Sequence, residues 1–119
     1  MLTDHQFDAW VTALKTEQYH QAHGRYEEYT RLPDGSKSVS YCVLGLLAHL
    51  NDKNPVFFYA LFSQKKYGVA DLAHHLTRLN DGIIFTRAEM SFPELAIWIE
   101  AHRALFVDES VPHGQHEPD

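Results

Sequence analysis

The sequence predicts a mostly α-helical, compact domain, with about four to five short helices around a buried central helix over residues 40–50. That stretch is the most apolar in the chain, and its side chains would cover nearly every side of a helix. Residues 7–14 carry apolar side chains at helical spacing: Phe7, Trp10, Val11 and Leu14. A Pro-Asp-Gly turn at 33–35 separates two short polar segments, which indicates one small β-hairpin over about 25–40.

The first helix should run over residues 4–16, because Thr3 and Gln6 can form a capping box at its start. The hairpin that follows should lie against the helices, since an isolated hairpin is only marginally stable in water. Ser40 is the candidate N-cap of the central helix. These local signals place the first three elements in order.

Gly45 lies inside the central helix, where glycine lowers helix propensity by about 1 kcal/mol relative to alanine. A glycine retained at that cost indicates close approach of another part of the chain. We expect another element to cross at Gly45, either the first helix near Trp10 or the last helix near Trp98.

The second half of the chain contains further helix-start signals. Asn54-Pro55 is typical of a helix start, so residues 56–62 are interpreted as a helix, with a buried strand as the alternative. The next helix is expected over residues 71–81. Residues 83–86 are expected to form a short strand or an apolar loop.

Ser91, Pro93 and Glu94 form the strongest helix-start signal in the chain and predict a last helix over residues 92–106. Residues 1–107 are therefore expected to form a single globular domain. The remaining residues 108–119 are polar, and we expect a mobile tail.

Composition excludes several classes of function. The chain has 119 residues and a net charge of −6, so it lacks the basic face that a nucleic-acid backbone binder needs. No apolar run reaches the length of about 20 residues that a membrane span requires. The N-terminal residues show no secretory signal pattern, so a cytoplasmic protein is expected.

Cys42 is the only cysteine and is a weak candidate for a catalytic nucleophile. A nucleophilic cysteine needs a lowered pKa and a nearby base, which His20, His23 or His102 would have to supply. An inert, buried thiol is the favoured interpretation, because free cysteine is among the most buried residue types. The nine histidines match no complete metal-binding pattern, so no metal site and no cofactor is predicted.

The aromatic run at residues 56–62 holds more apolar surface than one face of a short element can bury. The surplus, with tyrosines of the hairpin region, could form an exposed patch of the kind found at binding surfaces. Such a patch could bind a protein partner or a second copy of the chain, giving a homo-oligomer. The candidate binding residues are Phe57, Phe58, Tyr59, Phe62, Tyr26 and Tyr29.

Six separated segments form an ordered set of motifs along residues 7–100: Trp10 with Leu14, Tyr19-x-Gln21 with Gly24, Tyr41-Cys42-x-Leu44-Gly45-x-Leu47, Leu79-Asn80-Asp81, Ser91-Phe92-x-Glu94-Leu95-Ala96, and Ile99-Glu100. This order resembles a group of small proteins of unknown function from phages, prophages and bacteria. Many of those proteins carry two adjacent cysteines where this chain has Tyr41-Cys42. They also join the Leu-Asn-Asp motif to the Ser-Phe helix by a short turn, whereas here nine residues separate Asp81 from Ser91. The resemblance implies a phage or prophage setting and no particular activity.

Small size, acidic charge and the absence of an assembled catalytic motif favour a non-enzymatic binding protein. With the resemblance, they suggest an accessory protein of phage type that binds a host or phage protein. Inhibition of a bacterial defence complex is the specific version to test. The alternative is an enzyme of acyl or thiol transfer with Cys42 as nucleophile and a histidine as base.

Overall fold

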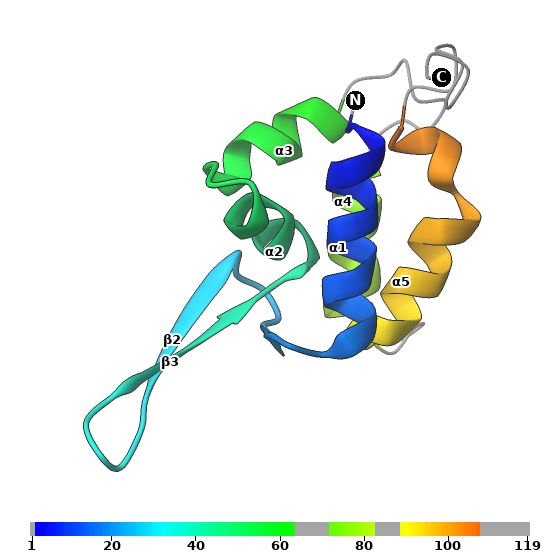
Figure 1. Cartoon of the computed structure of the whole chain (residues 1–119). Helices are drawn as coiled ribbons and strands as arrows, with labels where there is room; N and C mark the ends of the chain where they lie inside the picture. Colours follow the sequence, from blue (N-terminus) through cyan, green and yellow to red (C-terminus); the bar gives the residue numbers. More distant parts are fainter. Residues whose placement is uncertain (1, 64–71, 83–88, 108–119) are drawn as a thin grey trace.

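The computed structural model describes residues 2–63, 72–82 and 89–107. Within these residues, one helix is followed by three short strands and then by four more helices. In chain order the elements are α1 Asp4–Thr16, β1 His20–Gln21, β2 Glu27–Arg31, β3 Lys37–Tyr41, α2 Val43–Leu50, α3 Pro55–Phe62, α4 Leu72–Asp81, α5 Phe92–Ala101 and a 3-10 turn at Arg103–Leu105. The fold is mostly helical with one small β element, as the sequence predicts (Figure 1). The expected strand or loop at 83–86 and the expected tail at 108–119 lie outside the described residues.

Helix α1 has the bounds and the cap that the sequence predicts. Thr3 and Gln6 form a complete capping box, with each side chain accepting a hydrogen bond from the other's backbone N–H. Its apolar face is buried against α2 and α5, and α4 lies behind it in the view of Figure 1. The indole N–H of Trp10 donates to the carbonyl of Val43 at 3.0 Å, which ties α1 to the first turn of α2.

Helix α2 is the buried centre of the fold, and its first six residues are all inaccessible to solvent. The N-cap is Cys42 rather than Ser40, because β3 continues through Ser40 to Tyr41. The helix therefore begins three residues later than expected. Sequence signals for a cap cannot anticipate this, since the extension of β3 depends on pairing with two other strands.

The sheet has the strand order β1-β3-β2. The hairpin of β2 and β3 is antiparallel, and β1 adds a short parallel pairing to the inner end of β3. The expectation that the hairpin lies against the helices is wrong. Its outer part extends away from the helical body (Figure 1), and all five residues of β2 are exposed. The parallel strand β1 and the burial of Tyr41 hold only the inner end of the hairpin.

Helices α3 and α5 follow their predicted start signals. Asn54 caps α3, so the alternative of a strand at 56–62 does not apply, and Ser91 with Glu94 forms a second complete capping box before α5. The last helix ends at Ala101, earlier than the expected residue 106, and continues as a 3-10 turn. That turn directs Phe106 into the core, where its ring lies edge-on to Trp10 with centroids 5.5 Å apart.

Candidate functional site

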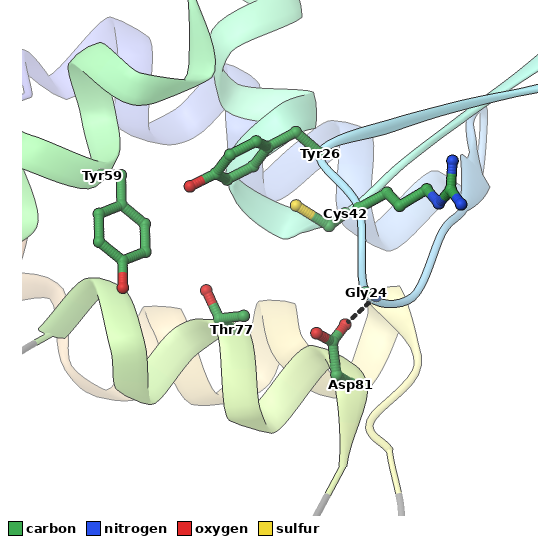
Figure 2. Close-up of a pocket in the computed structure, with 7 residues that line it drawn as sticks. Gly24, Tyr26, Cys42, Tyr59, Thr77 and Asp81 are labelled. Carbon is green, nitrogen blue, oxygen red and sulfur yellow. Dashed lines mark hydrogen bonds between the residues drawn. The ribbon is translucent and has the colours of Figure 1, made fainter.

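A cavity of about 230 Å³ opens at the root of the hairpin, where the loop before β2 passes over α3 and α4 (Figure 2). The loop contributes Gly24, Arg25 and Tyr26 to its lining. The helical side contributes Cys42, Tyr59, Thr77 and Asp81. The cavity thus joins segments that lie far apart in the sequence.

The loop reaches this position because Gly45 has no side chain. The Cys42 N–H donates to the carbonyl of Tyr26 at 3.1 Å, and a Cβ at Gly45 would lie 2.0 Å from that carbonyl oxygen. The expected crossing at Gly45 therefore exists. It is made by the backbone at Tyr26, however, and not by the helices at Trp10 or Trp98. Helical periodicity in the sequence does not predict that the neighbour of Gly45 is a loop carbonyl.

The side-chain amide of Asn80 connects three segments beneath the cavity, and this side chain is fully buried. Its Oδ1 accepts from Gln21 Nε2 at 2.9 Å and from the Val43 N–H at 3.2 Å. Its Nδ2 donates to the Ala22 carbonyl at 2.9 Å and to Asp81 at 2.8 Å. A buried amide with both ends satisfied holds β1, the start of α2 and the end of α4 in one arrangement.

Asp81 continues this network to the cavity surface. Its Oδ1 also accepts from the backbone N–H of Gly24 at 2.9 Å, which fixes the loop over α4 (Figure 2). Thr77 lies one helical turn before Asp81 and therefore faces the same side of α4. Sequence reasoning missed Asn80, Thr77 and Arg25 as site residues. The only signal was the Leu-Asn-Asp motif, in which a backbone contact of Asp81 could be expected.

Cys42 lines the cavity, but its environment opposes a nucleophilic role. The residue is buried, and its Sγ accepts a hydrogen bond from the Gly45 N–H at 3.3 Å. Burial raises the pKa of the thiol above its ordinary value, even though that hydrogen bond acts in the opposite direction. No histidine of the described segments lines the cavity. His102 instead stacks on Trp98, with ring centroids 4.0 Å apart.

We expect iodoacetamide to label Cys42 at neutral pH much more slowly in the native protein than in the denatured protein. Each unit by which the thiol pKa rises lowers the thiolate fraction about tenfold, and burial adds a steric barrier. Mass spectrometry of timed samples measures both rates on the same chain, because no other cysteine competes. Equal rates in the two states would show that the thiol is accessible and ionised.

The candidate binding residues do not form one patch. Phe58 and Phe62 are buried in the core, so the expectation that they belong to an exposed surface is wrong. Their rings complete the aromatic packing around Trp10, whose centroid is 6.3 Å from that of Phe62. Helix α3 therefore turns only part of its aromatic run outward.

The other four candidates lie in three places. Tyr26 and Tyr59 contact each other edge-on at the cavity, with ring centroids 6.4 Å apart. Phe57 is 52% exposed on α3, beside Lys53, whose Nζ lies 5.4 Å from the ring centroid. Tyr29 is 61% exposed on the hairpin. The structure thus divides the predicted patch into a cavity wall, a small helix patch and an arm.

Residues 2–63, 72–82 and 89–107 hold neither a metal-binding cluster nor a membrane-spanning helix. In those segments, no three or more side chains of His, Cys, Asp or Glu are grouped closely enough to hold a metal ion. The helices of the same segments include none with the length and apolarity needed to cross a bilayer. His20 and His23 form the one spaced histidine pair within the described part; His20 is the first residue of β1, and His23 follows the strand.

Three of the motifs that carry the family resemblance meet at this site. Gln21 and Gly24 come from the motif that begins at Tyr19. Cys42 and Gly45 come from the motif that begins at Tyr41, and Asn80 and Asp81 come from the Leu-Asn-Asp motif. Their hydrogen bonds and close contacts give each motif a structural reason. The family itself stays a prediction: comparison of the chain with protein-family models, curated proteins and solved structures gives no match.

Proposed function

We propose that this protein acts by binding another protein through the hairpin β2–β3. The observation that supports the proposal is the position of the hairpin, which extends from the helical body as an exposed arm (Figure 1). Strand β1 pairs only with Ser40 and Tyr41, so the outer edges of the arm have no neighbouring strand in the described segments. Uncovered strand edges readily pair with other chains, and an ordered arm presents them to a partner.

The register of the hairpin defines the chemistry of one face. Tyr29 lies opposite Val39, and Arg31 lies opposite Lys37 at the outer end. Side chains at alternate positions share a face, so the two cations and Tyr29 point to the same side. Lys37 Nζ lies 5.9 Å from the centroid of the Tyr29 ring. This face combines an exposed aromatic ring with two positive charges.

Two like charges directly opposite each other destabilise a strand pair. Within the described residues, neither Arg31 nor Lys37 lies within ion-pair distance of a carboxylate. An acidic patch on a partner would remove this repulsion, while Tyr29 would supply apolar contact area. The partner that best fits the arm is therefore a protein with an acidic surface next to an apolar contact.

The phage or prophage setting comes from the family resemblance alone. On that basis we propose that the partner is a host or phage protein in the bacterial cytoplasm, and that inhibition of a defence complex is the first activity to test. The arrangement would suit an inhibitor, because an arm of this kind can contact a partner without any catalytic group.

The proposal is tested by capture from bacterial lysate with the wild-type protein and with a variant carrying Arg31→Glu and Lys37→Glu. We expect the double variant to lose about tenfold or more in affinity for the captured protein, because two attractive charge contacts become repulsive. Affinity for the wild type should also fall as salt is raised. Circular dichroism would check that the variant keeps its helices.

Lys53→Glu is the control, since it reverses one positive charge in the same way beside Phe57 on α3. Loss of binding in this control, with the hairpin variant unaffected, would place the interface on α3 and contradict the proposal. Light scattering of the purified protein would identify a homo-oligomer. Absence of any partner, together with turnover of a small molecule, would replace binding by an enzymatic function.

A further inference from the structure

We propose that the cavity at the hairpin root binds a small molecule through a primary ammonium group. The inference rests on the cavity itself and is independent of the protein interaction proposed for the arm. With about 230 Å³, the cavity is smaller than the roughly 300 to 1,000 Å³ of pockets that take drug-sized ligands. It therefore fits a short aliphatic chain better than a nucleotide or an extended cofactor.

The α4 side of the cavity offers hydrogen-bond acceptors. Thr77 Oγ1 donates its own hydrogen to the Ala73 carbonyl at 2.9 Å, so only its lone pairs remain for a ligand. Asp81 is a carboxylate and can only accept at neutral pH. Its Oδ1 already accepts from Gly24 and Asn80, whereas its second oxygen points toward the Thr77 side of the cavity in Figure 2. A ligand here has to bring donors.

The charge and the rings of the cavity identify that donor as a cation. Asp81 brings a negative charge to a partly buried position, and a positive donor forms a stronger hydrogen bond with it than a neutral donor does. The rings of Tyr26 and Tyr59 line the same cavity, and aromatic faces attract cations. An ammonium group has three donors and no acceptor, which matches the acceptors of Asp81 and Thr77 on the α4 side of the cavity.

Two classes of small molecule carry a primary ammonium group, amino acids and simple amines, and Arg25 in the cavity lining would affect them differently. An amino acid would bring a carboxylate as well as the ammonium group, and the positive charge of Arg25 in the lining would attract that carboxylate. A simple amine or diamine would use the Asp81 end alone. Both share the ammonium contact, so the experiment has an arm for each.

The test is titration calorimetry of the full chain with n-butylammonium, putrescine and 4-aminobutanoate. Butanol and butyrate serve as matched ligands that lack the positive charge. We expect binding of the three amines at millimolar concentration or below, with no heat from butanol or butyrate. Tighter binding of 4-aminobutanoate than of n-butylammonium would identify the amino-acid source, and the reverse order would identify a simple amine.

Two variants test the residues in different ways. Asp81→Asn keeps an oxygen for the Gly24 N–H while removing the charge, and should weaken n-butylammonium about tenfold or more. Thr77→Val keeps the shape, removes the acceptor and should weaken it severalfold. Asp52→Asn makes the same charge change in the exposed turn after α2 and should leave the affinity unchanged.

Cys42 supplies a second readout that does not depend on heat. A ligand in the cavity should slow alkylation of this lining thiol in the wild type, and should protect it less in Thr77→Val. Equal binding of butanol and n-butylammonium, unchanged affinity in Asp81→Asn and Thr77→Val, or no binding of any amine would overturn the proposal. If Asp81→Asn fails to fold, the Thr77→Val result and the comparison of matched ligands decide it.

Discussion

Replacing Gly45 with alanine should destabilise the protein by about 3 kcal/mol, at the upper end of the usual cost of overpacking. The new Cβ would lie 2.0 Å from the carbonyl oxygen of Tyr26 and 2.8 Å from its carbonyl carbon. These are backbone atoms, so a change of rotamer cannot relieve the contact. The same carbonyl accepts from the Cys42 N–H, and relief therefore requires the hairpin root to separate from α2. Urea denaturation followed by circular dichroism measures the loss.

Gly35→Ala provides the comparison. Gly35 has a positive φ of 89° in the hairpin turn, and a Cβ there would meet nothing within 4 Å. Its cost should be about 1 kcal/mol from backbone strain alone. Gly45→Leu should be worse than Gly45→Ala, because every added atom enters the same occupied space. A stabilising effect of Gly45→Ala, as its helix propensity alone predicts, would show that the close approach does not exist.

The parts of the fold that local chemistry determines could be predicted from the sequence. Helix α1, both capping boxes and the turn at Pro33-Asp34-Gly35 follow from residues within a few positions of each other. The start of α2 could not be predicted, because Ser40 belongs to a strand whose length is set by pairing with β1 and β2. Local cap signals and non-local strand pairing compete for the same residues there.

The candidate site depends almost wholly on non-local contacts. Its lining comes from the loop at Gly24, from Cys42, and from Tyr59 and Asp81 on two helices, and no periodicity relates these positions. The aromatic run at 56–62 shows the opposite difficulty. Composition correctly indicates more apolar surface than one face can bury, but only packing decides that Phe58 turns inward and Phe57 outward.

Replacing Asn80 with aspartate should destabilise the protein by about 3 kcal/mol or more, although the two side chains have nearly the same shape. The substitution keeps Oδ1 for the Val43 N–H but turns the Nδ2 donor into an acceptor that faces the Ala22 carbonyl and the Asp81 carboxylate. Repulsion and burial would raise the pKa of the new carboxyl in the folded state above its unfolded value of about 3.9. The penalty relative to wild type should therefore be largest at neutral pH and shrink as pH falls below the unfolded pKa, where both states bind the proton.

Asn51→Asp is the matched control for this substitution, because the Asn51 side-chain amide makes similar hydrogen bonds. Its Nδ2 donates to the backbone carbonyl of Leu47 at 2.8 Å, and its Oδ1 accepts from Gln6 Nε2. Asn51 is partly exposed, so water can solvate the new charge, and we expect a cost of about 1 kcal/mol. Urea denaturation of both variants at several pH values gives the two differences from wild type. Equal costs for the two substitutions, or a penalty at Asn80 that does not change with pH, would mean that the buried amide is not the connection that holds β1, α2 and α4 together.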